Sequence, residues 1–357
     1  MSSSELGDLL LCQWEHLAAS AGVLRTTIDD TRRRCVPGSL GLVVQFNPSH
    51  IESKRPVDPQ LLKASTDESA VTQKTLGFNF TLAKKAEYLC GLRFKTHEDQ
   101  RLPSVQATGI EERGVEHFVL VNVAPLVRGH VLFVLDMDLV NPQSLTKKYM
   151  HYALGISRAI QREDFALGFN SAGAWSSVNH LHLHGYFFPQ REDRTSANFP
   201  VASQTKEVLF RVGGTLVNRL PDWAATCFVI EAEDAANDGV EVAQIAWTLL
   251  ELLQSRGTPH NLLVVDMKVF IYPRQPQCEN GTGLSSSYSN TMSAALVGRL
   301  RIAVAELSGL VVVGDRADYE NLTEETFSAI LDSEVSLSAA EEAALVATWK
   351  ENIRLRW

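Results

Sequence analysis

Three histidines occupy alternate positions of one short segment, where His180, His182 and His184 are separated by Leu181 and Leu183. Successive residues of a β-strand point to opposite faces, so a strand here would place three imidazoles on one face and two leucines on the other. Imidazoles removed from water need hydrogen-bond partners or a polar cavity. The spacing therefore predicts a chemical site on the histidine face, while the leucines anchor the strand in the core.

Two kinds of chemistry use such an array of imidazoles. Neutral imidazole is a common zinc ligand, which makes a zinc hydrolase one interpretation, beside a strand that is merely hydrogen-bonded. A ring nitrogen can also attack an electrophile, and neighbouring imidazoles and carbonyls then fix its tautomer. Residues 168–174 favour the nucleophile, because their glycines and small polar side chains can bring N–H groups close to a phosphate.

The histidines need a strand and its neighbours to position them. We expect a strand over Asn179–Phe188, and two earlier strands over Phe118–Val123 and Val131–Leu135. Apolar residues recur at every third or fourth position of Ser144–Gln161, which predicts a helix with Ser144 as its N-cap. The histidine strand would then lie in a sheet that is covered by this helix.

The rest of the chain mixes strands and helices without strict alternation, which favours an α+β fold with antiparallel sheets and packed helices. Ser338 and Glu341 fit a capping box at the start of the last helix. Residues 51–76 are predicted to form a long loop, and the polar residues 190–206 to separate two halves. The other expected elements are helices near 9–24, 240–253, 293–307, 324–331 and 339–352, and strands near 42–46, 208–212, 227–230, 261–265, 269–272 and 310–313.

The chain has 357 residues, of which 45% are hydrophobic, so it is long enough to bury a large core. Its net charge of −9 argues against a protein that coats nucleic acid. No apolar run approaches the ~20 residues of a membrane span, and the first residues lack the pattern of a secretory signal. The five cysteines are scattered, without a C-x-x-C pair. We therefore expect a cytoplasmic protein without disulfides and without nucleic-acid or membrane partners.

The histidine segment and the residues before it resemble a known family. Alternation of histidine with apolar residues is typical of the histidine triad superfamily of nucleotide hydrolases and transferases. Residues 168–186 as a whole are similar to the animal GDP-D-glucose phosphorylases and to their plant relatives, the GDP-L-galactose phosphorylases. The plant pattern has glutamine at the third histidine, so His184 favours the animal branch. Further similar segments, in the same order, are residues 45–48, 54–56, 77–80, 122–126, 129–130, 259–262 and 319–324.

The resemblance implies roles for individual residues. His182 would attack the α-phosphorus of the nucleotide and form a GMP–histidine intermediate. This ring must be neutral to attack, so activity is expected to fall below a pH of ~6.5, the ordinary pKa of histidine. His180 and His184 would orient and polarise the intermediate, and His130 matches a superfamily position near the active site. Substrate contacts are expected from Asn170, Ser171, Ser177 and Asn179.

The implied activity is that of a GDP-D-glucose phosphorylase, which transfers GMP from a GDP-hexose to inorganic phosphate and yields GDP and hexose 1-phosphate. The same residues would serve a GDP-sugar hydrolase, and a non-catalytic guanine-nucleotide binding or exchange protein is a further alternative. The resemblance also implies two similar halves, residues 9–195 with the triad and residues 196–357 without it. Residues 61–75 and 266–268 depart from the family pattern on the substrate side.

An anionic substrate needs cations, and Lys54, Arg55 and Arg274 are the candidates, since arginine can bind a phosphate through two parallel hydrogen bonds. Asn47 and His50 share one turn and are expected to line the base or ribose pocket. No magnesium motif such as a Walker loop is present, so we predict no cofactor and no obligate metal.

Overall fold

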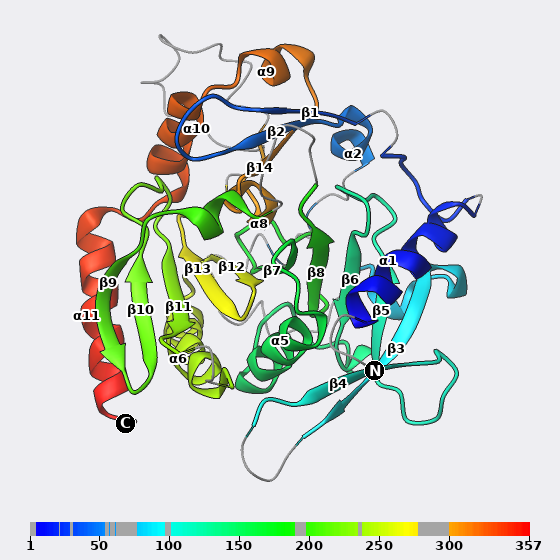
Figure 1. The fold of residues 1–357 in the computed structure, drawn as a ribbon, viewed down its shortest axis with the longest axis horizontal. Helices are drawn as coiled ribbons and strands as arrows, with labels where there is room; N and C mark the ends of the chain where they lie inside the picture. Colours follow the sequence, from blue (N-terminus) through cyan, green and yellow to red (C-terminus); the bar gives the residue numbers. More distant parts are fainter. Residues whose placement is uncertain are drawn as a thin grey trace.

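The computed structural model describes residues 5–20, 22–28, 31–53, 57, 61, 77–96, 101–189, 198–234, 238–277 and 300–357. Within these residues, eleven strands form one antiparallel sheet that runs through the molecule (Figure 1). In their order across the sheet, the strands are β4 (Ser104–Thr108), β3 (Tyr88–Lys95), β5 (His117–Val121), β6 (Val131–Val134), β8 (His182–Phe187), β7 (Phe165–Asn170), β12 (His260–Val265), β13 (Lys268–Pro273), β11 (Phe228–Ala232), β10 (Thr215–Arg219) and β9 (Glu207–Val212).

The sheet consists of two similar halves that meet at one pair of strands. The first half contributes β3 to β8, and the second half contributes β9 to β13. In each half a long helix leads into two paired strands: α5 (Lys147–Ile160) precedes β7 and β8, and α6 (Val240–Ser255) precedes β12 and β13. β7 and β12 pair antiparallel from Asn170 with Asn261 to Ala166 with Val265. The division into residues 9–195 and 196–357 stays a prediction, because this pairing makes the sheet continuous.

Helices cover one face of the sheet and bury the larger hydrophobic core. α5 and α6 pack against each other and against the central strands, with α1 (Glu5–Ala18) beside α5 and α11 (Ala339–Arg354) beside α6. Fully buried side chains such as Leu154, Leu249 and Trp349 fill this layer. Each contributes roughly 1.5–3 kcal/mol to stability by leaving water. This layer fixes the sheet on which the histidines lie.

The opposite side carries a second, smaller sheet made from both ends of the chain. It consists of β1 (Arg32–Cys35), β2 (Val43–Phe46) and β14 (Leu310–Val313), with β14 parallel to β2. A second core of buried residues, among them Tyr186 of β8 and Val311 of β14, joins this sheet to the large one. The remaining elements are α2 (Pro48–Ser53), α8 (Val304–Leu307), α9 (Arg316–Asn321), α10 (Glu324–Ile330), a π turn over Leu331–Val335, and 3₁₀ turns over Phe80–Leu82, Lys85–Glu87, Met137–Leu139 and Pro200–Ser203.

The structure differs from the expected elements at several boundaries. α5 begins two residues late, because the Thr146 side chain, not that of Ser144, accepts from the N–H of Tyr149. The Ser144 hydroxyl donates to Gln254 of α6 instead. The capping box at Ser338 is present, as predicted. The first helix spans 5–18 in place of 9–24, and the helix expected over 293–307 is described only as α8, since residues 291–299 lie outside the described residues. Strands β1, β3, β4, β7 and β10 were not expected.

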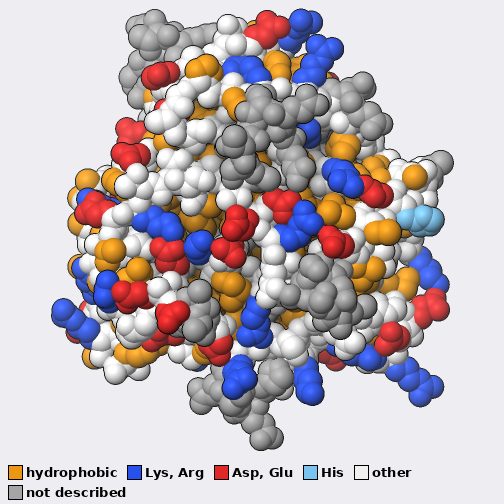
Figure 2. Space-filling view, viewed as in Figure 1, with side chains coloured by type: hydrophobic (Ala, Val, Ile, Leu, Met, Phe, Trp, Pro, Cys, Tyr) orange, Lys and Arg blue, Asp and Glu red, His pale blue; other side chains and the backbone are white. Residues whose placement is uncertain are grey.

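Charges of both signs are interspersed on the surface. On the face viewed in Figure 2, the Lys and Arg side chains lie among Asp and Glu side chains, with hydrophobic side chains scattered between them. The described part of this face therefore carries a mixed charge. None of the helices in the described ranges combines the length and the apolar character that a membrane span requires.

Candidate active site

A cavity lies over the large sheet where β5, β6 and β8 run side by side. His182, His184 and Tyr186 alternate along β8 and all line this cavity, as the strand period predicts. The register places His184 opposite Leu132 of β6, which in turn lies opposite Leu120 of β5. Both leucines line the cavity too. An apolar floor therefore extends across the sheet from the two histidines.

His182 is only 3% exposed and is held at three points. Its ring Nδ1–H donates to the carbonyl of His180 at 2.8 Å, which leaves the lone pair on Nε2. Its backbone N–H donates to Oε1 of Gln143 at 2.9 Å, and its carbonyl accepts from Nε2 of Gln143 at 3.1 Å. Burial lowers the pKa of His182 to about 4, although the bond to the His180 carbonyl acts in the opposite direction. The ring is therefore neutral at pH 7, as a nucleophile requires.

His184 is oriented by a chain of hydrogen bonds that passes through His130. The N–H of Leu126 donates to Nδ1 of His130 at 3.0 Å, so a neutral His130 carries its proton on Nε2. That Nε2 lies 3.1 Å from Nδ1 of His184 and 3.2 Å from Nδ2 of Asn122, which is itself a donor. The proton of His130 must point to His184. A neutral His184 then carries its own proton on Nε2 and is a hydrogen-bond donor at the cavity.

His180 lies outside β8 and outside the lining of the cavity, whereas a strand over all three histidines was expected. β8 begins only at His182, because the N–H of Leu181 donates to the carbonyl of Asn141 rather than to a neighbouring strand. Nδ1 of His180 accepts from the N–H of Phe80 at 3.0 Å, and the two rings pack at a tilt. His180 therefore acts on His182 through its carbonyl oxygen.

Asn170 and Ser177, both expected on the substrate side, line the cavity. Oδ1 of Asn170 accepts from Nδ2 of Asn261 at 2.7 Å and from the N–H of Val304 at 3.0 Å, so this side chain joins β7 to β12 and α8. Gly168 belongs to β7 rather than to a phosphate-binding loop. A side chain there would meet Val304 at 2.7 Å, so this glycine allows α8 to approach the sheet.

Ser171 and Asn179 support the loop that leads to the histidines and lie outside the cavity lining. The Ser171 hydroxyl donates to the carbonyl of Ala172 at 3.0 Å and accepts from the N–H of His260 at 2.8 Å. Oδ1 of Asn179 accepts from the N–H of Gln143 at 3.0 Å. Both side chains are buried and form hydrogen bonds within the protein.

The predicted cations are not brought to the histidines. Arg274 is buried and does not line the cavity that contains His182. Its guanidinium donates instead to Asn261 and to the carbonyl of Ile302. Lys54 and Arg55 lie outside the described residues. Within the described ranges, the arginines that line the cavity are Arg25 and Arg301.

Several lining residues were missed by sequence reasoning. Arg301 lies over the ring of Trp175, with 5.6 Å between the guanidinium carbon and the ring centroid. Glu87 lines the cavity near the apolar floor. His50 lines it as expected, with its Nδ1–H donating to the carbonyl of Ala124, whereas Asn47 caps α2 through the N–H of His50. No local pattern marks Arg301 or Glu87, because each is placed by the fold rather than by its neighbours in sequence.

Comparison with known proteins identifies one family over most of the chain. Two family models match, "GDPGP1-like, N-terminal domain" over residues 5–186 and "GDPGP1-like, C-terminal domain" over residues 200–354. The chain belongs to the GDPGP1-like family. This confirms the predicted resemblance to the GDP-sugar phosphorylases.

Named relatives of this GDPGP1-like chain are enzymes. GDP-L-galactose phosphorylase 2 of Arabidopsis thaliana is 26% identical over 339 residues, which is 93% of this chain and 73% of the relative. GDP-D-glucose phosphorylase 1 of Homo sapiens is 28% identical over 358 residues, which is 95% of this chain and 83% of the relative. Phosphorylases of GDP-sugars are nucleotidyltransferases, and we assign this chain to the same enzyme class.

Solved structures show the same fold. The yeast Ap4A phosphorylase Apa2 in complex with Ap4A has a TM-score of 0.57 at 18% identity, and the match covers 91% of this chain and 95% of that one. The expected α+β class, with antiparallel strands, packed helices and two similar halves, is confirmed by this match and by the sheet.

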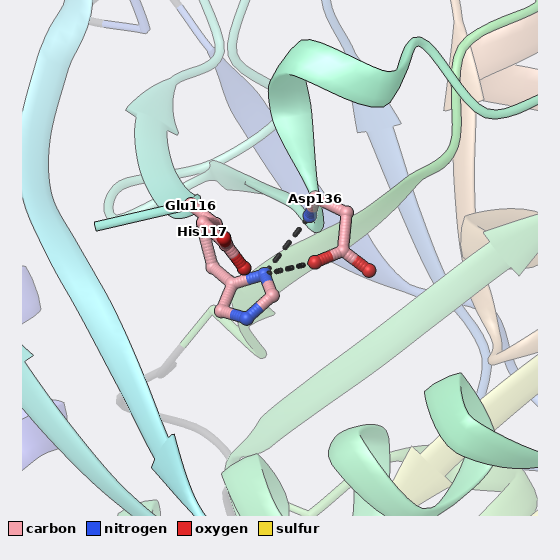
Figure 3. Close-up of side chains that lie close together, drawn as sticks. All are labelled: Glu116, His117 and Asp136. Carbon is pink, nitrogen blue, oxygen red and sulfur yellow. Dashed lines mark hydrogen bonds and ion pairs between the residues drawn. The ribbon is translucent and has the colours of Figure 1, made fainter. Parts of the chain in front are cut away.

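A separate cluster of histidine and carboxylate groups lies at the start of β5 and just after the end of β6 (Figure 3). It consists of Glu116, His117 and Asp136, whose potential ligand atoms lie close enough together to hold a metal ion. Among the described residues, no other such group of histidine, cysteine and carboxylate side chains occurs. Nδ1 of His117 accepts from the N–H of Asp136 at 2.9 Å, and the Asp136 carboxylate is paired with Lys148 at 2.6 Å. His117 and Asp136 therefore connect β5, the end of β6 and α5 through hydrogen bonds and the Asp136–Lys148 ion pair.

The low pKa of His182 changes the expected pH dependence of this GDPGP1-like enzyme. Because protonation near pH 4 removes the lone pair of Nε2, a chemical step in which this nitrogen is the nucleophile should keep its rate down to about pH 5 and fall only near pH 4. Single-turnover release of hexose 1-phosphate without inorganic phosphate measures this step alone. A rate that halves near pH 6.5 in a folded enzyme would contradict the buried, neutral His182.

The fold of the enzyme must be monitored at each pH of this experiment. Burial lowers the pKa of His180, His182 and His260 to about 4. The stability that these neutral rings contribute is present above pH 6.5 and is lost as the pH falls towards 4, by about 1.4 kcal/mol per pH unit for each proton. Circular dichroism at each pH separates loss of fold from loss of chemistry.

Proposed function

We propose that this protein is a GDP-D-glucose phosphorylase that transfers GMP to inorganic phosphate through a GMP–His182 intermediate. The observation that carries the proposal is the state of His182. Its ring is buried and neutral, lines the cavity, and has Nδ1 engaged by the His180 carbonyl, so Nε2 is the atom that can meet an electrophile.

The reaction takes place in two displacements at phosphorus. Nε2 of His182 attacks the α-phosphorus, the bond to the bridging oxygen breaks, and hexose 1-phosphate leaves with that oxygen. An oxygen of inorganic phosphate then attacks the same phosphorus, the P–N bond breaks, and GDP is released. A neutral nucleophile avoids the repulsion between two anions in the first step, and the His180 carbonyl stabilises the positive charge that forms on the ring.

His184 is placed to stabilise the charge on the phosphate. Its ring lies 5.1 Å from that of His182, centroid to centroid, and its Nε2–H is a donor because Nδ1 accepts from His130. A preorganised donor of this kind lowers the barrier when negative charge grows on the phosphoryl oxygens. Arg301, in the same lining, adds a positive charge.

The apolar part of the cavity lining favours guanine. Leu120, Leu132 and Phe78 provide apolar surface for a base, and the half-buried Glu87 lies among the lining residues. The Glu87 carboxylate makes no hydrogen bond or ion pair within the part of the chain that the structure describes. Guanine presents two adjacent donors, N1–H and the 2-amino group, which a carboxylate accepts together. At that edge adenine presents the N1 acceptor and no 2-amino group, and uracil presents a single donor, N3–H, between two carbonyl oxygens.

A panel of nucleotide sugars tests the proposal. GDP-D-glucose, GDP-L-galactose, ADP-glucose and UDP-glucose are each incubated with and without inorganic phosphate, and products are separated by chromatography. We expect GDP and hexose 1-phosphate from the GDP-hexoses, with catalytic turnover only when phosphate is present. At least a hundredfold preference for GDP-glucose over ADP-glucose is expected from the donor pattern of the base.

The alternatives give different products. GMP as the main product in saturating phosphate identifies a GDP-sugar hydrolase. Tight binding of GDP without any turnover identifies a non-catalytic guanine-nucleotide binding protein. Equal rates with GDP-glucose and UDP-glucose would contradict the assignment of the base site.

A further inference from the structure

Beside His182, the side chain of Gln143 takes the place of the backbone hydrogen bonds that would otherwise continue the pairing of β7 with β8. β7 and β8 pair from Phe165 with Phe187 to Gly168 with His184. Two residues further, the same register would place Asn170 opposite His182. There Nε2 of Gln143 donates to the carbonyl of Asn170 at 3.1 Å, and its Oε1 accepts from the N–H of His182 at 2.9 Å. One side-chain amide therefore stands between the two strands.

All the hydrogen-bonding atoms of this amide are engaged, which defines its orientation. The His182 N–H needs an acceptor, so the nearer atom is Oε1. The carbonyls of Asn170 and His182 both need donors, so the other atom is Nε2, which uses its two hydrogens on them. Gln143 is 1% exposed, and its own N–H donates to Oδ1 of Asn179. A buried amide with this set of partners has one orientation and little freedom to move.

We infer that Gln143 is a positioning residue, which fixes the backbone of His182 on both sides and thereby sets the place where Nε2 meets the α-phosphorus. Direct pairing of β7 with β8 would draw Asn170 against His182. The inserted amide keeps the strands apart at this point while it satisfies both. This inference rests on the proposed function, since it assumes that His182 is the nucleophile.

Two substitutions test this role in the full-length enzyme. Gln143→Glu keeps the shape of the side chain but replaces both donor hydrogens with an oxygen that faces two carbonyls. Gln143→Met keeps the length and removes all three hydrogen bonds. We expect the rate of protein labelling by [α-32P]GDP-glucose to fall about a hundredfold in both variants, as a displacement of about 1 Å at the reacting atoms would cause. The Kd for GMP, measured by calorimetry, should change less than about threefold.

The pH profile provides a readout that a purely structural role would not change. A carboxyl group held between two carbonyls has a raised pKa, and its protonated form regains one donor hydrogen. Labelling of Gln143→Glu should therefore become faster from pH 8 to pH 6, whereas the wild-type rate stays level. Gln161→Glu, an exposed residue at the C-terminus of α5, is the matched control and should label like wild type.

The outcomes separate the two claims. Absence of labelled wild-type protein refutes the proposed function itself. Labelled wild type together with wild-type rates in folded Gln143→Met, or with a level pH profile in Gln143→Glu, refutes the role of Gln143. If Gln143→Met does not fold, as judged by circular dichroism, the pH profile of Gln143→Glu decides the question.

Discussion

Replacement of His182 by asparagine should lower turnover of GDP-glucose by roughly 10⁵-fold or more, because the group that forms the covalent intermediate is gone. The asparagine amide is short, but it can still donate to the carbonyl of His180, which His182 now reaches at 2.8 Å. The backbone bonds to Gln143 do not depend on the side chain. The variant should therefore fold and bind GDP while it fails to release hexose 1-phosphate.

Covalent trapping makes this result specific. Wild-type protein incubated with [α-32P]GDP-glucose without phosphate should carry label that is stable in alkali and lost in acid, as a phosphorus–nitrogen bond is. His182→Asn should carry none. His16→Asn, an exposed position near the end of α1, is the control and should label fully. Turnover or label in folded His182→Asn at more than one hundredth of the wild-type level would assign the nucleophile to another residue.

Replacement of His184 by phenylalanine should lower kcat by about a thousandfold, the effect of removing one preorganised donor from a developing anion. The hydrogen-bond chain from Leu126 through His130 ends in the Nε2–H of His184, so the phenylalanine ring removes the donor and retains the bulk. Since the apolar floor is unchanged, the affinity for GMP should fall much less than kcat.

His184→Gln is the conservative partner of that variant. A glutamine amide presents an N–H at a similar distance from the backbone, so at least a tenth of the wild-type kcat should return. Steady-state kinetics on both variants, with binding of GMP by calorimetry, check the prediction. Equal loss in the phenylalanine and glutamine variants would show that the imidazole acts by more than donation of a hydrogen bond.

Local patterns in the sequence were sufficient to predict the elements that carry the site. The period of two from His180 to His184 predicted a strand, and the recurring apolar residues of α5 predicted the helix behind it. β14 has the expected bounds, since four consecutive apolar residues follow Gly309. These signals are short-range, so one segment contains each of them in full.

Other features depended on contacts between distant segments. His180 lies outside the strand because the N–H of Leu181 donates to the carbonyl of Asn141, about forty residues away in the sequence. Arg274 has the charge of a phosphate ligand, but its guanidinium is buried against backbone and amide oxygens. Gln143 had no motif to mark it, because a side chain that takes the place of a strand pairing is recognised only when both strands are placed.

The parallel contact between β2 and β14 also constrains how the chain can be divided or assembled. Val43 and Leu310 are register partners although 266 residues lie between them, so this ladder closes only after nearly the whole polypeptide has been synthesised. Asn47 follows β2 directly and caps α2, and His50 of α2 lines the cavity. A fragment that ends before residue 310 would therefore contain His182 but would lack β14, the strand that holds β2 and the adjoining cavity wall in place.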